Sequence, residues 1–225
     1  TQFTNPNDLQ TYPRTMESDI QLCEAAGVDY LFTPSVEEMY PTGATLPTLS
    51  AGLLGTILEG ASRRGHFDAV ATVVHRLLDI TSPDLTCFGE KDFQQLAVVR
   101  AMVAQENIHC DVVGVPTVRD IDGLALSSRN VRLTPEQRAA AVCIPQALME
   151  CARIAESTGD VAAAIEAGQR VISAAETAVL DYFVIRALDL SAAPETGPAR
   201  ALVAVSFGDV RLIDNYPVNI GAVQS

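Results

Sequence analysis

Residues 89–92 (GEKD) have the types and the placement to bind an anion. They follow a short apolar stretch, residues 85–88, and precede a helical pattern that runs from Lys91 to Glu106. A helix N-terminus presents unpaired N–H groups and the positive end of the helix dipole, and Gly89 would let a ligand approach the backbone closely. Lys91, the one lysine beside fourteen arginines, would add a compact positive charge. A glycine turn with a solvated Lys91–Asp92 pair explains the same four residues equally well.

Residues 127–130 (SSRN) are a second candidate anion site. The hydroxyls of Ser127 and Ser128 and the guanidinium of Arg129 suit phosphate oxygens, because they combine several donors in one short loop. A turn built from serine and asparagine, with Arg129 at the surface, is the commoner structure for such a tetrapeptide. The residues alone leave both interpretations open.

Residues 59–67 (EGASRRGHF) form a third candidate, a basic segment with a glycine near each end before a helix. Arg63 and His66 would face an anion if the segment lined a site. The local pattern favours a flexible loop in which His66 caps the helix that follows.

Three further polar side chains could serve a site. Gln95 lies four residues after Lys91, so in one helix both would project from the same face. Gln2 offers the same amide chemistry, which suits hydroxyl and carboxylate groups. Asp19 stands near a predicted helix start, where a carboxylate suits the dipole, and a magnesium role is the alternative.

Predicted helices and strands alternate in the first half of the chain, and they would position these residues. Helical spacing predicts helices over 15–26 and 67–80, and apolar runs predict strands over 28–33, 85–88 and 110–115. With the helix from Lys91 to Glu106, the last two strands form a strand–helix–strand unit, which is typical of a parallel sheet.

The pattern changes after Pro116. Thr134, Pro135 and Gln137 form a helix-start signature, and an alanine-rich helical region continues to about residue 178. Short strands are predicted at 182–186, 201–207 and 211–215, the last two joined by a Gly–Asp turn at 208–209. We therefore expect an α/β fold with a Rossmann-like parallel sheet in residues 1–117 and a smaller α+β domain in residues 118–225.

Composition narrows the function classes. The formal net charge of −13 disfavours binding to nucleic acid or an anionic membrane, and no apolar run has the length of a membrane span. The five cysteines show no C-x-x-C spacing and predict reduced, buried thiols in a cytoplasmic protein. The three histidines form no metal-ligand pattern with them.

Six ordered motifs together resemble the pantoate–β-alanine ligase (pantothenate synthetase) family. They span nearly the whole chain, and their order and spacing are far more specific than any short pattern. The motifs are YPRT (12–15), AGVDYLFTPSVEEMYP (26–41), LEGASRRGHF (58–67), CFGEKDFQQL (87–96), VGVPTVRDIDGLALSSRN (113–130) and RLIDN (211–215).

The resemblance implies a nucleotidyltransferase-type Rossmann domain, a smaller C-terminal domain and a homodimer. It also implies a two-step reaction. The carboxylate of pantoate attacks the α-phosphate of ATP to give pantoyl adenylate and pyrophosphate, and the amine of β-alanine then displaces AMP. Mg²⁺ would accompany the ATP, with Asp19 as the residue that could contact it.

Site residues follow from the same resemblance, motif by motif. Lys91 and Arg129, with Ser127 and Ser128, would hold the phosphates and stabilise transition-state charge. Gln95 and Gln2 would bind pantoate, with Gln2 also near β-alanine, while Arg63 and His66 would line the site. The ATP-binding set is Gly89, Glu90, Lys91, Asp92, Val118, Leu126, Ser127, Ser128 and Arg129, with Val118 near the adenine.

One departure from the family bears on whether the chain is catalytic. The family's H-x-G-H nucleotide motif lies upstream of the segment that Gln2 matches, and these 225 residues do not contain it. The chain as written is therefore expected to hold part of an active site. The alternatives are another adenylating nucleotidyltransferase and a non-catalytic fragment that binds nucleotide or dimerises.

Overall fold

A computed structural model describes residues 14–43 and 47–221. The chain divides into two compact units. Unit 1 comprises the residues up to Asp84 together with Ala101–Cys110, and unit 2 comprises Leu85–Arg100 together with the residues from Asp111 onward. The domain boundary expected between residues 117 and 118 stays a prediction.

The described part of unit 1 is helical. Its helices are α2 (Met16–Ala25), α3 (Val36–Met39), η1 (Gly52–Gly55), α4 (Glu59–Ser62) and α5 (His66–Thr81). Helix α2 confirms the predicted helix before Gly27, which has a φ of 75°. Helix α5 confirms the periodic apolar pattern, because its buried face consists of Phe67, Val70, Ala71, Val74 and Leu78.

The strand predicted over residues 28–33 is wrong. These residues form no strand, and Tyr30 and Phe32 are 93% and 51% exposed. A strand needs a neighbour to complete its hydrogen bonds, and every strand in the described residues lies in unit 2. An apolar run alone therefore does not make a strand here.

The predicted strand–helix–strand unit is present, with both strands in unit 2 and its helix divided between the two units after Arg100. Strands β1 (Leu85–Gly89) and β2 (Asp111–Val115) pair in parallel, with Leu85 opposite Asp111 and Gly89 opposite Val115. Between them the chain forms a short 3₁₀ turn, η2 (Glu90–Asp92), and then helix α6 (Phe93–Gln105). The predicted parallel sheet is confirmed, but the α-helix begins at Phe93, so Lys91 lies in the turn before it.

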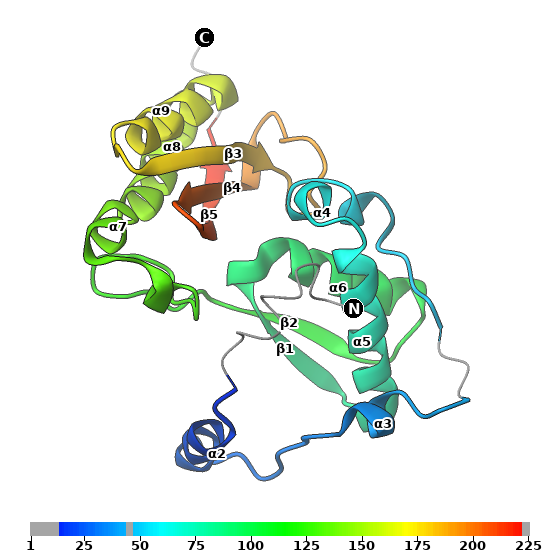
Figure 1. The fold of residues 1–225 in the computed structure, drawn as a ribbon. Helices are drawn as coiled ribbons and strands as arrows, with labels where there is room; N and C mark the ends of the chain where they lie inside the picture. Colours follow the sequence, from blue (N-terminus) through cyan, green and yellow to red (C-terminus); the bar gives the residue numbers. More distant parts are fainter. Residues whose placement is uncertain (1–13, 44–46, 222–225) are drawn as a thin grey trace. The chain divides into compact units, whose positions relative to one another are not determined.

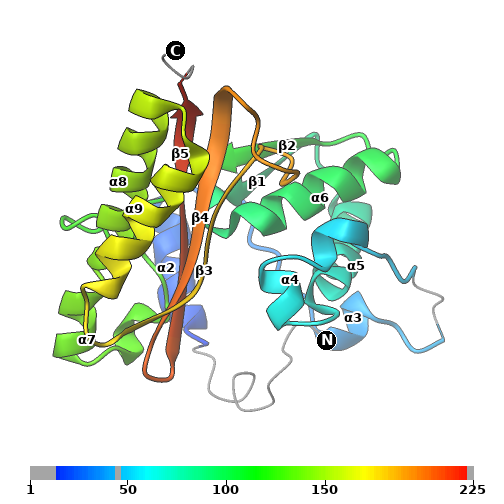
Figure 2. The same ribbon diagram turned by 90° about the horizontal axis from the view of Figure 1, so that it is seen from above.

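The rest of unit 2 consists of helices followed by an antiparallel sheet (Figures 1 and 2). The helices are η3 (Asn130–Arg132), α7 (Pro135–Ala140), α8 (Cys143–Thr158) and α9 (Val161–Ser173); the strands are β3 (Ala178–Arg186), β4 (Gly197–Phe207) and β5 (Val210–Ile220). Thr134 and Gln137 form the predicted capping box, and Gly208 turns the predicted β4–β5 hairpin with a φ of 57°. The helical region ends at Ser173, a few residues earlier than expected.

Helices α8 and α9 cover one face of the β3–β4–β5 sheet (Figure 2). Side chains alternate between the two faces of a strand. Ala201 and Val203 of β4, with Leu212 of β5, belong to the core beneath the helices. A Cβ added to Gly168 of α9 would lie within 3.0 Å of the Phe183 ring, so this glycine permits the close packing of α9 on β3. The predicted combination of a parallel sheet with a C-terminal α+β part is confirmed.

The cysteine prediction is only partly right. None of the five cysteines is in a disulfide, but Cys143 and Cys151 are buried, Cys23 and Cys110 are intermediate, and Cys87 is exposed. The last three lie outside the buried face of a helix or sheet, where an apolar neighbourhood in the sequence does not ensure burial.

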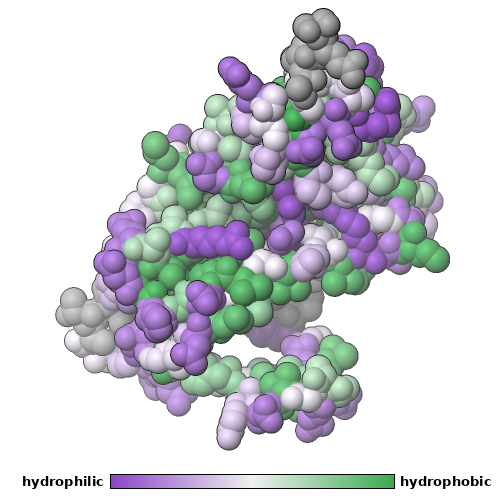
Figure 3. All heavy atoms as spheres, turned by 180° about the vertical axis from the view of Figure 1, so that it is seen from behind, coloured by the Kyte–Doolittle hydropathy of each residue, from purple (hydrophilic) through white to green (hydrophobic). Residues whose placement is uncertain are grey.

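Exposed apolar side chains also occur on the surface, as the green areas of Figure 3 illustrate. In unit 2 they include Leu85, Val113 and Val115 on one face of the β1–β2 pair. Across residues 14–43 and 47–221, no helix combines the length and the apolar character of a membrane span.

Candidate active site

Lys91 lies just beyond the carboxyl end of strand β1, in the turn η2. In open α/β sheets, ligands bind beyond the carboxyl ends of the strands. The Lys91 side chain is 18% exposed, and its Nζ lies 4.0 Å from Asp92 Oδ1, the upper limit for an ion pair. The contact with Asp92 is therefore loose, and the position of Lys91 fits the predicted anion site.

The second candidate segment is held in a closed loop. Arg119 and Ala125 form an isolated antiparallel bridge, and the Leu126 N–H donates to the Val118 carbonyl at 2.9 Å. Val118, which was expected near the adenine, and Leu126, the first residue of the second ATP-binding segment, are thus neighbours. Beyond them the Ser127 hydroxyl accepts a hydrogen bond from the Arg129 N–H at 3.2 Å, while Ser128 and Arg129 are exposed. The segment is a turn, and its exposed side chains are available to a ligand.

Helix α7 fixes this loop through one arginine. Arg138 donates to Asp122 at 2.6 Å and to Asp120 at 2.9 Å. The hydrogen bond from Arg138, together with one from the Leu124 N–H, holds the pKa of Asp122 below its usual value. The loop from Arg119 to Ala125 is therefore anchored at its tip as well as at its base.

A small pocket joins the two candidate segments. Lys91 lines it from η2, while Ala125, Ser127 and Asn130 line it from the loop. The enclosed volume is only about 10 Å³, which is roughly the space that one water molecule needs. The pocket therefore shows that the two segments lie side by side, and it is too small to enclose a nucleotide.

Asn130 leaves an acceptor unused beside this pocket. Its Nδ2 donates to the Ala125 carbonyl at 3.0 Å, but its buried Oδ1 has no hydrogen-bond partner within the described structure. Buried polar atoms are nearly always paired, so this oxygen is suited to a donor from a ligand or a water molecule.

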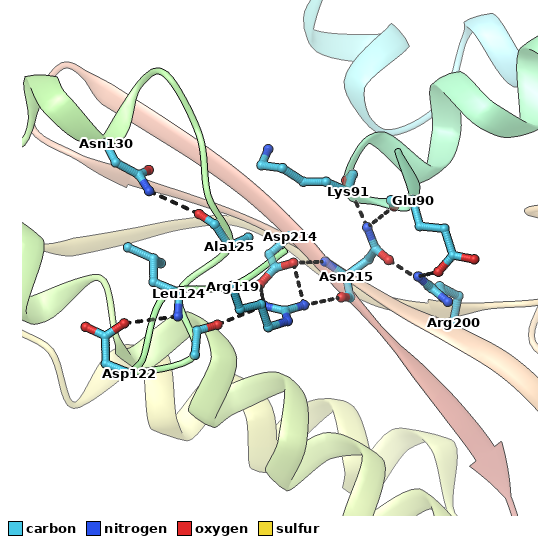
Figure 4. A network of polar contacts seen from close by, with 11 residues as sticks. Glu90, Lys91, Arg119, Asp122, Leu124, Ala125, Asn130, Arg200, Asp214 and Asn215 are labelled. Atoms are coloured by element: carbon cyan, nitrogen blue, oxygen red, sulfur yellow. Dashed lines mark hydrogen bonds and ion pairs between the residues drawn. The ribbon is translucent and has the colours of Figure 1, made fainter. Parts of the chain in front are cut away.

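The side chains on β5 were missed by reasoning from the sequence. Asp214 and Asn215, the last two residues of the RLIDN motif, are 3% and 2% exposed and connect η2 with the loop (Figure 4). Two consecutive polar residues in a strand that is otherwise rich in buried apolar residues were the available signal.

Asp214 and its neighbour make different connections. Asp214 accepts two hydrogen bonds from Arg119, at 2.7 and 3.0 Å, and Arg119 also donates to the Gly123 carbonyl at 3.0 Å. Asn215 Nδ2 donates to the carbonyls of Glu90 and Lys91, both at 2.9 Å. One strand thus contacts both segments that line the pocket.

Gln95 lies on helix α6 and is half-buried. Because α6 begins at Phe93, Lys91 and Gln95 do not share one regular α-helix, and the spacing argument that placed them on one face loses its basis. Gln95 is not among the residues that line the pocket. Its role in binding pantoate stays a prediction.

Unit 1 carries the other described candidates. Asp19 is exposed in the first turn of α2 and accepts a hydrogen bond from the Thr15 hydroxyl at 3.1 Å. Residues 59–62 form helix α4 rather than a flexible loop, and Arg63 follows it. His66 is the first residue of α5, whose N-cap is Gly65, so His66 is not the predicted capping residue. Gln2 lies outside the described residues.

Comparisons with known proteins identify the family. The sequence model described as Pantoate-beta-alanine ligase matches residues 1–217. A pantothenate synthetase from Salinispora arenicola is 46% identical over 97% of this chain and 78% of its own length, and one from Mycolicibacterium smegmatis is 46% identical over 98% and 69%.

Solved structures agree with the sequence relatives. A crystal structure of pantothenate synthetase from Thermus thermophilus superposes with a TM-score of 0.89 at 46% identity, covering 96% of this chain and 79% of that one. A pantoate-beta-alanine ligase from Francisella tularensis, solved with beta-gamma ATP and beta-alanine, has a TM-score of 0.72 at 36% identity over 96% and 75%. The chain belongs to the pantoate–β-alanine ligase family.

Proposed function

We propose that this protein joins pantoate to β-alanine in an ATP-dependent reaction that passes through pantoyl adenylate and releases pyrophosphate and AMP. Family membership supports the overall reaction. The single structural observation that carries the site assignment is the pocket lined by both Lys91 and Ser127, since it unites two segments assigned to ATP from widely separated parts of the sequence.

In the first step a carboxylate oxygen of pantoate attacks the α-phosphorus of ATP, and the bond to the pyrophosphate oxygen breaks. The step needs positioning and neutralisation of charge more than a protein nucleophile. Lys91 and Arg129 would supply positive charge to the phosphates, and the hydroxyls of Ser127 and Ser128 would donate hydrogen bonds. Support comes from the placement of Lys91 at the end of β1 and of the exposed Arg129 on the neighbouring loop.

The remaining residues of the proposed ATP site would contact the adenosine part and the phosphates. Val118 and Leu126, joined by a backbone hydrogen bond, would contact the adenosine part. Gly89, whose backbone has open space around its Cα, would let the phosphates approach the strand end. Glu90 and Asp92 flank Lys91 in η2 and belong to the same proposed segment.

In the second step the β-alanine amine attacks the carbonyl carbon of the adenylate, and the bond to the AMP oxygen breaks. Gln95 and Gln2 would orient pantoate, with Gln2 also near β-alanine, while Arg63 and His66 would line the site. These four assignments rest on the sequence motifs. The reactive anhydride also requires exclusion of water between the two steps.

Mg²⁺ would enter with the nucleotide and neutralise phosphate charge. No group of three His, Cys, Asp or Glu side chains in the described residues is arranged to hold a metal ion. This fits a Mg²⁺ ion that is bound through phosphates and water with at most one carboxylate, for which Asp19 is the candidate. We further propose a cytoplasmic homodimer, on the strength of the motif resemblance.

The direct test is product analysis with all three substrates. We expect equal amounts of AMP and pantothenate that depend on pantoate, β-alanine and ATP. A panel of other small hydroxy acids in place of pantoate tests the assignment of the substrate, and comparable product from all of them would point to a different adenylating enzyme. Nucleotide binding without any product would favour the non-catalytic alternative.

A further inference from the structure

The RLIDN motif has no role in the chemistry described so far. Its last residue, Asn215, is only 2% exposed on β5, and its whole side chain is engaged in hydrogen bonds. Nδ2 donates to the carbonyls of Glu90 and Lys91, both at 2.9 Å, and Oδ1 accepts from Arg200 Nε at 2.6 Å. A buried amide that is fully paired at both ends specifies one geometry for the groups it contacts.

Arg200 reinforces the same turn from the neighbouring strand. It lies on β4, is 8% exposed, and its Nη2 donates to Glu90 Oε2 at 2.9 Å. Its guanidinium also stacks over the Phe93 ring, 4.5 Å from the centroid, at the start of α6. The turn η2 is therefore held through its backbone by Asn215 and through the Glu90 side chain by Arg200.

The alternation of β5 explains why two adjacent residues reach different segments. Asp214 shares its face of the strand with Leu212, on the side covered by the helices, and Asn215 projects from the opposite face. Asp214 holds the loop through Arg119, while Asn215 holds η2 (Figure 4). A single strand thus sets the separation between Lys91 and the segment that begins at Val118.

We propose that Asn215 is a positioning residue for adenylation, acting through the carbonyls of Glu90 and Lys91 to fix η2 and thereby the Lys91 ammonium and the N–H groups that follow it. This inference rests on the proposed function. In a helical turn the N–H groups and the carbonyls point in opposite directions along the axis, so fixing the two carbonyls also fixes the N–H groups of the same turn. Fixed donors are worth most where charge develops in the transition state, so a loosened turn should slow the reaction more than it weakens substrate binding.

Asn215→Asp isolates this role. The aspartate has nearly the same shape and can still accept from Arg200, but its carboxylate cannot donate to the two carbonyls. Asn219→Asp is the matched control, because Asn219 lies four residues along β5 on the same face, is exposed, and undergoes the same chemical change. Asn215→Ser is the second variant, which removes the amide without adding charge in case the aspartate disturbs folding.

The readouts are pantoate-dependent exchange between ATP and pyrophosphate, with kcat and KM for each substrate, and the thermal melting temperature. We expect Asn215→Asp and Asn215→Ser to lower kcat by about a hundredfold, with the KM of pantoate changed less than about threefold. Asn219→Asp should behave as the wild type. A loss of activity that merely follows the fraction of unfolded protein would overturn the inference, because a purely structural role predicts it.

The outcomes separate the two claims. If the wild type exchanges and both Asn215 variants match Asn219→Asp, the positioning role is wrong while the proposed function stands. If the folded wild type shows no exchange with pantoate, the proposed function fails, and the positioning role that rests on it fails with it.

Discussion

The carboxylate of Asp214 and the guanidinium of Arg119 form a two-point ion pair, although the residues are 95 positions apart in the sequence. The two hydrogen bonds measure 2.7 and 3.0 Å, and the Asp214 side chain is 2% exposed. This pair ties the base of the loop that carries Ser127–Arg129 to strand β5. The proposed ATP site thus depends on an ion pair beside it, since Asp214 lines the same pocket as Lys91 and Ser127.

Replacing Arg119 should therefore destabilise the fold. Arg119→Gln would leave the buried Asp214 carboxylate without its partner, and breaking a buried pair in this way costs about 3–5 kcal/mol in the free energy of unfolding. The measurement is urea denaturation of the variant and the wild type.

Arg170→Gln supplies the matched control for that experiment. Arg170 also pairs with a carboxylate, Glu166, but both side chains are 68% exposed, and such pairs contribute about 0–1 kcal/mol. Adding Asp214→Asn to Arg119→Gln should recover part of the lost stability. Equal destabilisation by Arg119→Gln and Arg170→Gln would show that the buried pair does not hold the loop.

The sequence predicted the elements that carry local signals. The capping box at Thr134 and Gln137, the Gly208 turn and the periodic face of α5 all appear as expected, because each is determined by residues close together in the chain. The strand expected at 28–33 does not form, since strand formation depends on a pairing partner that a local pattern cannot reveal.

In the candidate site, too, local features could be predicted from the sequence and long-range contacts could not. The helix-start and turn chemistry around Lys91 and Ser127 was visible in the sequence, but the pocket that unites them was not. Asp214 and Asn215 escaped notice as site residues because their partners are more than 90 positions away, and only folding brings them together. Long-range polar pairs of this kind leave no periodicity to detect.

Helix α9 should tolerate little added volume at Gly168. Gly168→Ala would place a methyl group against the Phe183 ring, and overpacking of this kind typically costs about 1–3 kcal/mol, partly offset by the better helix propensity of alanine. Chemical denaturation of the single variant and of Gly168→Ala with Phe183→Leu tests the contact. If the smaller partner fails to reduce the cost of the alanine, Phe183 is not the cause.

Two buried thiols predict a loss of stability at alkaline pH. Burial raises the pKa of Cys143 to about 11 and that of Cys151 to about 12, from a value of 9.0 when unperturbed. Below pH 9 both folded and unfolded states keep these protons. Above it the unfolded state loses them first, so the free energy of unfolding should fall by about 1.4 kcal/mol per pH unit for each thiol until the folded thiols ionise.

Denaturation from pH 8.5 to 10.5, with a reductant present, measures this dependence. Other groups titrate in the same range, so the test is the difference between the wild type and Cys151→Ala. Above pH 9 the free energy of unfolding of Cys151→Ala should fall less steeply with pH than that of the wild type. The difference in slope should be the contribution of one thiol, about 1.4 kcal/mol per pH unit. Parallel slopes would mean that Cys151 ionises as readily in the folded protein as in the unfolded chain.

Lysine-selective labelling offers a specific probe of the ATP site. Lys91 is the one lysine in the chain, so apart from the α-amine it is the one expected target. Saturating ATP should slow its modification at least about tenfold, because a phosphate-bound ammonium is both paired and covered. Arg129→Gln should need more ATP for the same protection, and Lys91→Arg should leave only the α-amine to react. Modification that ATP does not slow would place Lys91 outside the site.

The most direct test of the account is exchange of labelled pyrophosphate into ATP in the presence of pantoate and the absence of β-alanine. Formation of pantoyl adenylate is reversible, so the account predicts exchange that requires pantoate and that falls by about a hundredfold or more in Lys91→Ala. Exchange that proceeds equally without pantoate, or is unchanged in Lys91→Ala, would contradict an adenylation centre built around η2 and the loop held by Asp214.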